Sequence, residues 1–288
     1  MIHILITGAN SYIGTSVEKW VLQKTNSCCI DTLDMKSEEW KNKSFSQYDV
    51  VFHVAGIAHV SSDPKLKDLY FKVNRDLTVE TAKKAKSDGV KQFIFMSSII
   101  VYGSSARIGK EKRITSQTKM EPADFYGQSK LEAEEGLLAL ENDDFKVAII
   151  RPPMIYGKGS KGNYSKLSRM AQRFPLFPKV NNSRSMLYID NLCEFVRLLI
   201  RDECRGIFYP QNREYVNTSE MVKRIAACHN RKMYLTKIFN PVLYLSAVFV
   251  GIVNKVFGNL TYEKEMSENW NFEYCVVDFE ESIKQTEG

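Results

Sequence analysis

The chain has 288 residues, 44% of them hydrophobic, which is enough apolar material to bury a sizeable core. Its net charge is +6 without a long basic run, and aromatic residues do not alternate with basic ones as in single-strand binders, so we expect no nucleic-acid partner. The six cysteines form no CxxC pair and no basic leader precedes the first apolar run, so we expect a reduced, cytoplasmic protein.

The first half of the chain alternates between short apolar runs and amphipathic segments. Apolar runs without polar alternation, separated by helices, are typical of a parallel sheet that is covered on both faces. The sequence therefore predicts an α/β fold with a Rossmann-like doubly wound sheet. We expect strands over 2–6, 28–33, 49–55, 92–97 and 146–150, and helices over 13–24, 69–87 and, after a turn, 121–140.

Beyond Arg151 the pattern becomes irregular and rich in proline and glycine. We place a dinucleotide-binding domain at 1–152 and a smaller, loop-rich C-terminal substrate lobe at 153–288. Within the lobe, a segment over 184–205 is expected to return to the first domain and to rejoin its sheet, with a strand over 185–189 and a helix over 192–201.

One stretch of the C-terminal lobe, PVLYLSAVFVGIV from Pro241 to Val253, is nearly all apolar. It falls short of the roughly 20 residues that span a bilayer. We therefore expect a buried helix there. A weak contact with a membrane surface is the alternative.

A glycine turn, TGANSYIG from Thr7 to Gly14, lies between the first strand and the first helix. Such a turn lets backbone N–H groups and the helix N-terminus meet a pyrophosphate. The dinucleotide pattern places glycines at positions 8, 11 and 14; position 11 is Ser here, which is small and can donate a hydrogen bond. The candidate cofactor contacts in the turn are Gly8, Asn10, Ser11, Tyr12, Ile13 and Gly14.

Asp34, at the end of the second strand, supports the same interpretation. A carboxylate at that distance accepts hydrogen bonds from the ribose hydroxyls and repels a 2′-phosphate. NAD(H) is therefore the favoured cofactor. NADP(H) stays open, because Lys36 nearby would soften the preference.

Ser98, Tyr126 and Lys130 can carry chemistry together. Ser98 follows the fourth strand, and ligands in this fold bind beyond the carboxyl ends of the strands. Tyr126 and Lys130 are four residues apart on one face of the next helix. A free tyrosine has a pKa of about 10, which a nearby ammonium and an oxidised nicotinamide would lower. Tyr126 can then exchange a proton with a carbonyl or alcohol oxygen that Ser98 holds, while Lys130 holds the nicotinamide ribose.

Seven motifs follow one another between Met1 and about Leu192: TGANSYIG, YDVVFHVAGIAHV, FKVN, SSIIVYG, YGQSK, RPPMIYG and RSMLYIDNL. With this set in this order, the chain resembles the extended short-chain dehydrogenase/reductases of the nucleotide-sugar epimerase/dehydratase family. The resemblance implies a catalytic trio of Ser98, Tyr126 and Lys130, with Ser98 and Tyr126 also contacting the substrate. It further implies cofactor contacts from Ala55, Gly56, Asn74 and Pro153.

The family includes several sugar reactions. Its dehydratases carry an acidic pair directly after the catalytic hydroxyl, where this chain has Ile99 and Ile100, which argues against a 4,6-dehydratase. The chain is similar to UDP-sugar 4-ketoreductases and 4-epimerases of bacterial capsule and O-antigen pathways. We favour reduction of a UDP-4-keto-6-deoxy-N-acetylhexosamine in surface-polysaccharide precursor synthesis. A UDP-hexose or UDP-N-acetylhexosamine 4-epimerase is the alternative, and a non-catalytic dinucleotide-binding sensor is a remote one.

The resemblance also implies contacts outside the trio. Arg184 matches the family position that pairs with the nucleotide diphosphate of a UDP-sugar, and Asn163 lies in the loop that contacts substrate phosphates. The acidic helix after Lys130 has a solvated face as its simplest interpretation, although family members often dimerise through it, so we expect a homodimer. His53 and His59 are expected to pack rather than to catalyse, and four scattered His predict no metal site.

Overall fold

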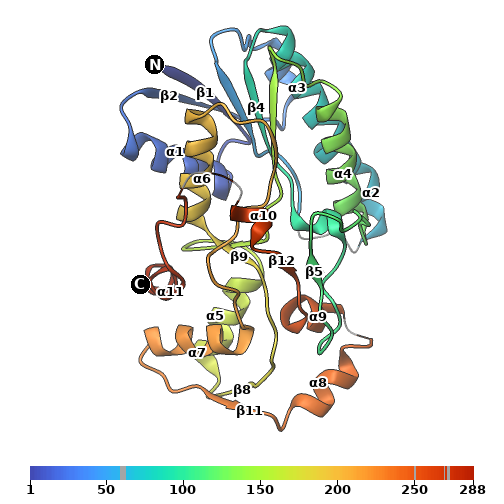
Figure 1. Ribbon diagram of the computed structural model, residues 1–288, viewed down its shortest axis with the longest axis vertical. Coiled ribbons are helices and arrows are strands. Elements are labelled where there is room, and N and C mark those ends of the chain that lie inside the picture. The colour runs from blue at the N-terminus through green and yellow to red at the C-terminus, as the bar shows by residue number, and fades with distance from the viewer. Residues whose placement is uncertain (59–62, 250, 269, 271–272) are drawn as a thin grey trace. The chain divides into compact units, whose positions relative to one another are not determined.

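In the computed structural model of the protein, which describes residues 1–58, 63–249, 251–268, 270 and 273–288, the chain forms two compact units (Figure 1). Each unit gathers three separate stretches of the chain. Unit 1 comprises Met1–Gly103, Met120–Pro152 and Ile189–Pro210, and unit 2 comprises Ser104–Lys119, Pro153–Tyr188 and Gln211–Gly288.

Unit 1 is built on a six-stranded, fully parallel sheet with the order β10-β6-β4-β3-β1-β2. Its central strands are buried along their whole length, as expected for strands covered on both faces. The sequence-based prediction of an α/β, Rossmann-like fold is confirmed. The strands are β1 (Ile2–Thr7), β2 (Cys28–Leu33), β3 (Val50–His53), β4 (Gln92–Met96), β6 (Lys146–Ile150) and β10 (Gly206–Phe208).

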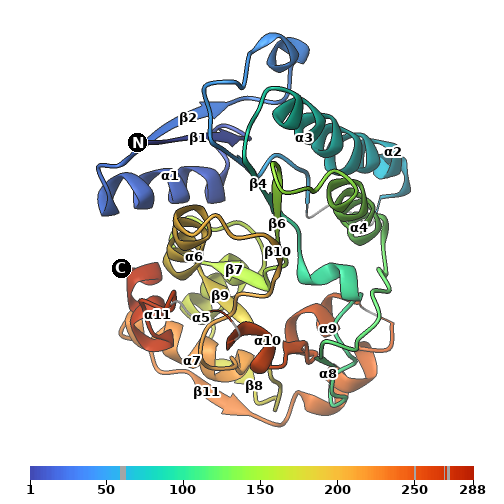
Figure 2. The ribbon, with the colours of Figure 1, turned by 45° about the horizontal axis from the view of Figure 1, so that its top comes forward.

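Helices cover both faces of this sheet (Figure 2). On one face α1 (Tyr12–Lys24) packs against α6 (Ile189–Arg201). On the other face α4 (Phe125–Leu138) packs against a continuous helical stretch in which a π-helical turn joins two α-helices. That stretch consists of α2 (Lys67–Tyr70), η3 (Phe71–Asp76) and α3 (Leu77–Ser87), and the shorter turns of the unit are η1 (Glu38–Asn42), η2 (Pro64–Leu66) and η4 (Ile99–Tyr102).

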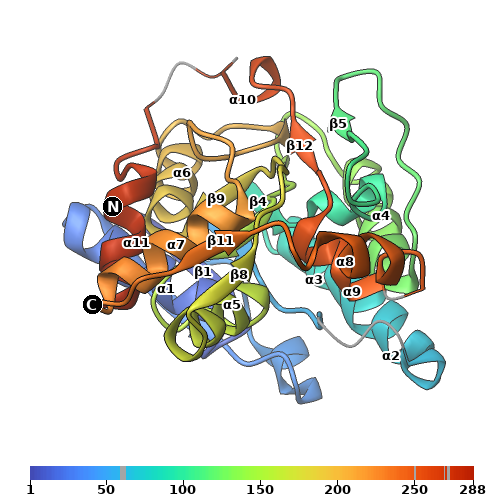
Figure 3. The same ribbon diagram turned by 90° about the horizontal axis from the view of Figure 1, so that it is seen from below.

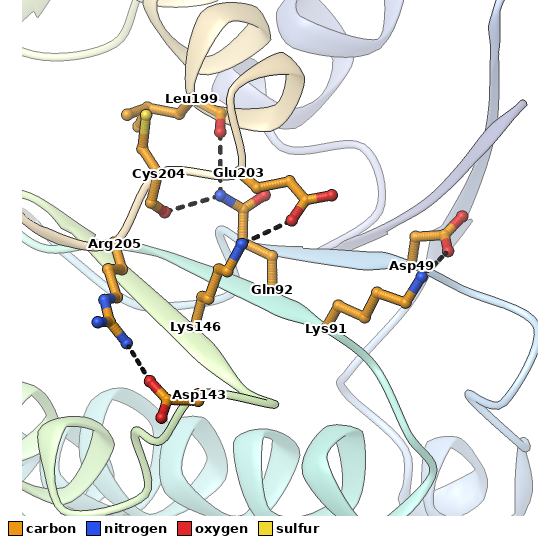
Figure 4. A network of polar contacts seen from close by, with 9 residues as sticks. All are labelled: Asp49, Lys91, Gln92, Asp143, Lys146, Leu199, Glu203, Cys204 and Arg205. Carbon is orange, nitrogen blue, oxygen red and sulfur yellow. Dashed lines mark hydrogen bonds and ion pairs between the residues drawn. The ribbon is translucent and has the colours of Figure 1, made fainter.

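The end of α6 is fastened to the amino ends of β4 and β6 (Figure 4). The buried amide of Gln92 donates hydrogen bonds to the carbonyl oxygens of Leu199, at 3.0 Å, and Cys204, at 2.8 Å. These carbonyls belong to the last turn of the helix and the residues after it, where acceptors have no partner within the helix. Lys146 and Glu203 form an ion pair of 2.6 Å beside them. The last turn of α6 is thus held at the amino ends of the strands, which is the end of the sheet opposite the expected ligand-binding edge.

Unit 2 contains small two-stranded sheets and short helices. Its three sheets pair β11 with β8, β12 with β5, and β7 with β9, all in parallel. The strands are β5 (Arg113–Ile114), β7 (Met154–Tyr156), β8 (Leu176–Pro178), β9 (Met186–Tyr188), β11 (Tyr234–Thr236) and β12 (Thr261–Tyr262). The helices are α5 (Asn163–Arg173), α7 (Thr218–Cys228), α8 (Asn240–Ser246), α9 (Gly251–Phe257), α10 (Glu265–Glu268) and α11 (Phe279–Glu287).

Two expectations from the sequence are wrong in this architecture. The strand over 185–189 does not rejoin the large sheet: β9 pairs with β7, and the sixth strand is β10, which the sequence pattern did not reveal. The apolar stretch from Pro241 is not a buried helix either, because α8 has no buried residue. None of the helices among the described residues is long and apolar enough to cross a membrane.

Candidate functional site

The glycine turn joins the carboxyl end of β1 to the first turn of α1. Gly8 has φ +95°, and a Cβ there would lie 2.8 Å from the backbone nitrogen of Ala55, so only glycine allows this approach to the end of β3. Ser11 is the N-cap of α1, and its Oγ accepts a hydrogen bond from the Gly14 N–H at 3.1 Å. A Cβ at Gly14 would lie 2.6 Å from that Oγ. Serine at position 11 therefore acts as a helix cap, and its hydroxyl hydrogen stays available as a donor.

Asp34 lies directly after β2 and is exposed. The carbonyl oxygen of Leu33 beside it accepts hydrogen bonds from the N–H groups of Gly8, at 2.8 Å, and Ala9, at 3.1 Å. The structure thus brings the carboxylate and the glycine turn to adjoining positions at one edge of the sheet. A phosphate-binding turn next to an exposed carboxylate is a donor and acceptor set that fits a dinucleotide.

Asn74 is fully buried in the π-helical turn η3 and braces the loop that follows β3. Its Oδ1 accepts from the Ile57 N–H at 2.9 Å, and its Nδ2 donates to the Ile57 carbonyl at 3.0 Å and to the Ser129 hydroxyl at 3.2 Å. A Cβ at Gly56 would lie 3.0 Å from Asn74 Oδ1 and 3.4 Å from Lys130 Nζ. The loop containing Ala55 and Gly56 therefore passes next to Lys130, and Asn74 holds it there.

Ser98 and Tyr126 come together because η4 packs against the first turn of α4. Asp124 caps α4 by accepting from the Gly127 N–H at 2.9 Å. A Cβ at Gly127 would lie 2.9 Å from the Ile100 carbonyl oxygen, so this glycine permits the close packing of the two elements. The Ser98 side chain is a neighbour of the Tyr126 phenol and acts to lower its pKa. Two neighbouring hydroxyls can hold one substrate oxygen between them.

The pKa of Tyr126 is raised to about 12, first by burial of its hydroxyl, with the Ser98 side chain acting in the opposite direction. The sequence predicts a lowered pKa with Lys130 as one cause. In the structure the ionisable side chains of Tyr70 and Asp124 act on this phenol instead, and both raise its pKa. A phenol surrounded by protein releases its proton only when positive charge is brought close to it.

Lys130 is buried, and its ammonium group is fixed at the carboxyl end of β4. Its Nζ donates to the Met96 carbonyl oxygen at 2.8 Å and lies 4.5 Å from the centre of the Phe95 ring. Burial lowers its pKa to about 8, and the negative charge of Glu134 works against that lowering. The lysine is thus held one helical turn from Tyr126, beside the loop at Gly56.

Beneath the trio lies a buried ion pair that the sequence analysis did not identify. Glu134 is bonded to the guanidinium of Arg151, with two contacts of 3.1 Å from Nε, and also accepts from the Ser97 hydroxyl. Arg151 reaches the Tyr102 hydroxyl at 2.6 Å. The acidic helix after Lys130 is therefore not a purely solvated face. No spacing pattern in the sequence pointed to Glu134, because its partner Arg151 lies 17 residues further along the chain, directly after β6.

The two histidines differ in what the structure shows. His53 is fully buried at the end of β3, with Nδ1 2.7 Å from the Thr7 hydroxyl and Nε2 3.1 Å from the Thr78 hydroxyl. Burial, followed by the positive charge of Lys130, lowers its pKa to about 3, so it is a neutral packing residue as expected. His59 lies outside the described residues.

In unit 2, Arg184 is 8% exposed and no negatively charged side chain among the described residues neutralises it. Its guanidinium donates to the Gly258 carbonyl oxygen at 2.7 Å and to the Ser105 hydroxyl at 3.3 Å, and no carboxylate among the described residues pairs with it. Burial alone lowers its pKa to about 10. A buried guanidinium of this kind fits an anionic ligand. Asn163, half-buried, begins α5, and Pro153, buried, is where unit 2 resumes after β6; no bond links either to Arg184.

Comparisons with known proteins agree with this geometry. The model of the NAD dependent epimerase/dehydratase family matches residues 4–208. The chain is 32% identical over 246 residues to the UDP-glucose 4-epimerase of Vibrio cholerae, covering 77% of this chain and 74% of that protein. It is 25% identical over 275 residues to N-acetyl-alpha-D-glucosaminyl-diphospho-ditrans,octacis-undecaprenol 4-epimerase of Escherichia coli O157:H7, covering 89% and 81%.

Among solved structures, a dTDP-4-dehydrorhamnose reductase from Clostridium acetobutylicum superposes with a TM-score of 0.75 at 19% identity, covering 99% of this chain and 98% of the other. A likeness at that identity shows the fold. The family match extends over most of unit 1, where the glycine turn, Asp34, Ser98, Tyr126 and Lys130 lie. The chain belongs to the NAD-dependent epimerase/dehydratase family, the nucleotide-sugar branch of the extended short-chain dehydrogenase/reductases.

Proposed function

We propose that the protein is a UDP-sugar 4-epimerase that uses NAD(H), with reduction of a UDP-4-keto sugar as the second candidate. The placement of Ser98 beside the Tyr126 phenol, one helical turn from a buried Lys130, supports the assignment of chemistry at a carbon–oxygen bond. The sequence alone favoured reduction, and the preference for epimerisation comes from two relatives matched over 74% and 81% of their length, which are both named as 4-epimerases.

Each residue of the site has a separate role in the proposed reaction. Tyr126 takes the proton of the C4 hydroxyl when the sugar is oxidised and returns it when the keto sugar is reduced, and Ser98 holds the same oxygen. Lys130 orients the nicotinamide ribose. Bound nicotinamide supplies the hydride acceptor and donor. Asp34 binds the adenosine ribose, with Gly8, Ser11 and Gly14 at the pyrophosphate, and Arg184 binds the substrate diphosphate.

Purified protein incubated with NAD and UDP-glucose or UDP-N-acetylglucosamine tests the proposal. An epimerase converts each sugar to a mixture with its C4 epimer without net change in NADH absorbance, and Tyr126→Phe should lower the rate by roughly 100-fold or more while cofactor binding persists. Stoichiometric NADH oxidation with a UDP-4-keto-6-deoxy sugar, without epimerisation, would favour the reductase. Cofactor binding without either reaction would leave a sensor, and turnover by Tyr126→Phe near the wild-type rate would contradict the assignment of the phenol.

A further inference from the structure

Seven large apolar side chains of unit 2 are exposed within a short stretch of chain. The most exposed are Ile238 at 81%, Val242 at 72%, Leu245 at 68% and Phe249 at 82%. Contiguous apolar surface of this kind marks a contact site in a protein that is otherwise well packed. We call these seven residues, on α8 and its two flanks, the 238–249 surface: Ile238, Phe239, Val242, Tyr244, Leu245, Val248 and Phe249.

Contacts at Tyr244 and at Ala247, the C-cap, connect α8 to the rest of unit 2. Tyr244 lies against Gly109, where a Cβ would come within 3.1 Å of its ring, and the Asn254 amide donates to the Ala247 carbonyl oxygen at 2.8 Å. Ala247 itself is buried. Seen from below, α8 follows β11, whose exposed Tyr234 lies beside exposed Leu176 of β8 (Figure 3).

The segment of chain that contains this surface carries charge of a single sign. Residues 221–262 contain six Lys and Arg and no Asp or Glu. The remaining 34 of the chain's 40 basic residues are matched by its 34 acidic residues, so the whole net charge of +6 resides in this segment. Its exposed basic residues that form no ion pair with another described residue are Lys223, Arg231, Lys232, Lys237 and Lys255.

We propose that the 238–249 surface docks on an anionic lipid bilayer, with α8 lying in the plane of the membrane interface. An apolar face flanked by lysines, too short to span, is the signature of an interfacial helix. Negatively charged headgroups attract unneutralised Lys and Arg next to such a helix. A second copy of the chain is a poorer occupant, because a twofold contact through this surface would bring two segments of charge +6 together.

Vesicle flotation tests the proposal with intact protein. Wild type should float with vesicles of phosphatidylglycerol and phosphatidylcholine and much less with phosphatidylcholine alone. Val242→Ser/Leu245→Ser/Phe249→Ser should weaken the binding by at least about tenfold. Lys232→Glu/Lys237→Glu should weaken it by roughly tenfold on anionic vesicles only, as should salt of about 0.5 M. All the replaced side chains are exposed, so circular dichroism and the melting temperature should not change.

The control replaces three exposed apolar residues elsewhere, Leu22→Ser/Leu69→Ser/Val276→Ser, which are 48%, 46% and 47% exposed. This control should float as wild type does. The proposal is overturned if wild type does not float with anionic vesicles, or if the 242/245/249 variant floats equally well. It is also overturned if that variant instead changes the native mass from dimer to monomer while vesicle binding is the same, because a second copy then covers the surface.

Discussion

Lys130 is a buried amine whose pKa of about 8 lies below its ordinary value of 10.5, chiefly because of burial. The unfolded chain therefore binds a proton more readily than the folded chain between pH 8 and 10.5. Over that window folding stability rises with pH as the unfolded state gives up its proton, and the full penalty is present below pH 8. Glu134 limits the penalty, since its carboxylate raises the pKa of Lys130.

The free energy of unfolding of wild type and Lys130→Met, measured in urea at about pH 7 and about pH 10, tests this account. Between these two pH values the free energy of unfolding of wild type should rise relative to that of the variant by up to ~3 kcal/mol, which is the free energy that corresponds to the difference between the folded and unfolded pKa. Lys65→Met removes an exposed lysine and is the control, with a difference that should not depend on pH. If the difference in the free energy of unfolding between wild type and Lys130→Met did not change with pH, the ammonium group of Lys130 would be solvated.

Asp34 should decide the choice between the two dinucleotides. The variant Asp34→Asn keeps the shape of the side chain and removes the charge that repels a 2′-phosphate. We expect its affinity for NADH to fall roughly tenfold and its affinity for NADPH to stay level or rise, as measured by quenching of intrinsic fluorescence. Glu39→Gln, at an exposed position on η1, should change neither affinity. If the affinities for NADH and NADPH fell equally, Asp34 would not be the residue that binds the adenosine ribose.

Single residues were predictable where their position along the fold carried the signal. Ser98, Tyr126 and Lys130 could be proposed together because each follows a recognisable strand or opens a helix, and in the structure the Ser98 side chain is a neighbour of the Tyr126 phenol. Glu134 could not be found this way, since a glutamate in an acidic helix resembles a solvated one. Only the packing of α4 on β6 brings it to Arg151.

At the scale of elements, the site depends on how closely α4 approaches η4, and Gly127 sets that distance. In Gly127→Ala the new Cβ meets the backbone oxygen of Ile100, which cannot turn away as a side chain could. We expect a loss of stability of ~1–3 kcal/mol from overpacking, together with a larger loss of turnover because Tyr126 is displaced from Ser98. Chemical unfolding and initial rates on the same sample separate the two effects.

Gly251→Ala is the matched control for that prediction, since nothing lies within 4 Å of a Cβ at this helix position. It should be neutral or slightly stabilising, because alanine favours a helix more than glycine does. If Gly127→Ala retains wild-type turnover and stability, the contact between α4 and η4 is not what positions the phenol.

An element could be predicted where the sequence contains an apolar run. Which elements would pack or pair with each other was harder to predict. The runs at β2 and β6 matched the structure residue for residue, since each is bounded by turn signals, although only β6 is buried and β2 is an edge strand without a buried residue. β10 is only three residues long and lacks such a signal. For α8 the pattern correctly indicated an apolar helical segment, but whether another surface covers it depends on tertiary packing, which periodicity does not report.

At the scale of the whole molecule, the chain passes between the two units five times, at 103/104, 119/120, 152/153, 188/189 and 210/211. Unit 1 is therefore not a continuous fragment. Its last stretch supplies β10, which pairs with β6, and α6, which buries ten of its residues and packs on α1. Val17 and Val21 of α1 are buried in the intact protein.

Residues 1–152 expressed alone should consequently fail to fold cooperatively, although they contain the glycine turn, Asp34 and the proposed catalytic residues Ser98, Tyr126 and Lys130. Without 189–210, β6 becomes an edge strand, Gln92 loses the acceptors at Leu199 and Cys204, and the apolar face of α1 meets water. The same fragment joined by a flexible glycine–serine linker to 189–210 restores all three contacts and should unfold in urea with one sigmoidal transition. If 1–152 alone unfolds with the same midpoint and slope, the returning segment contributes nothing to unit 1, and a continuous dinucleotide-binding domain is the better description.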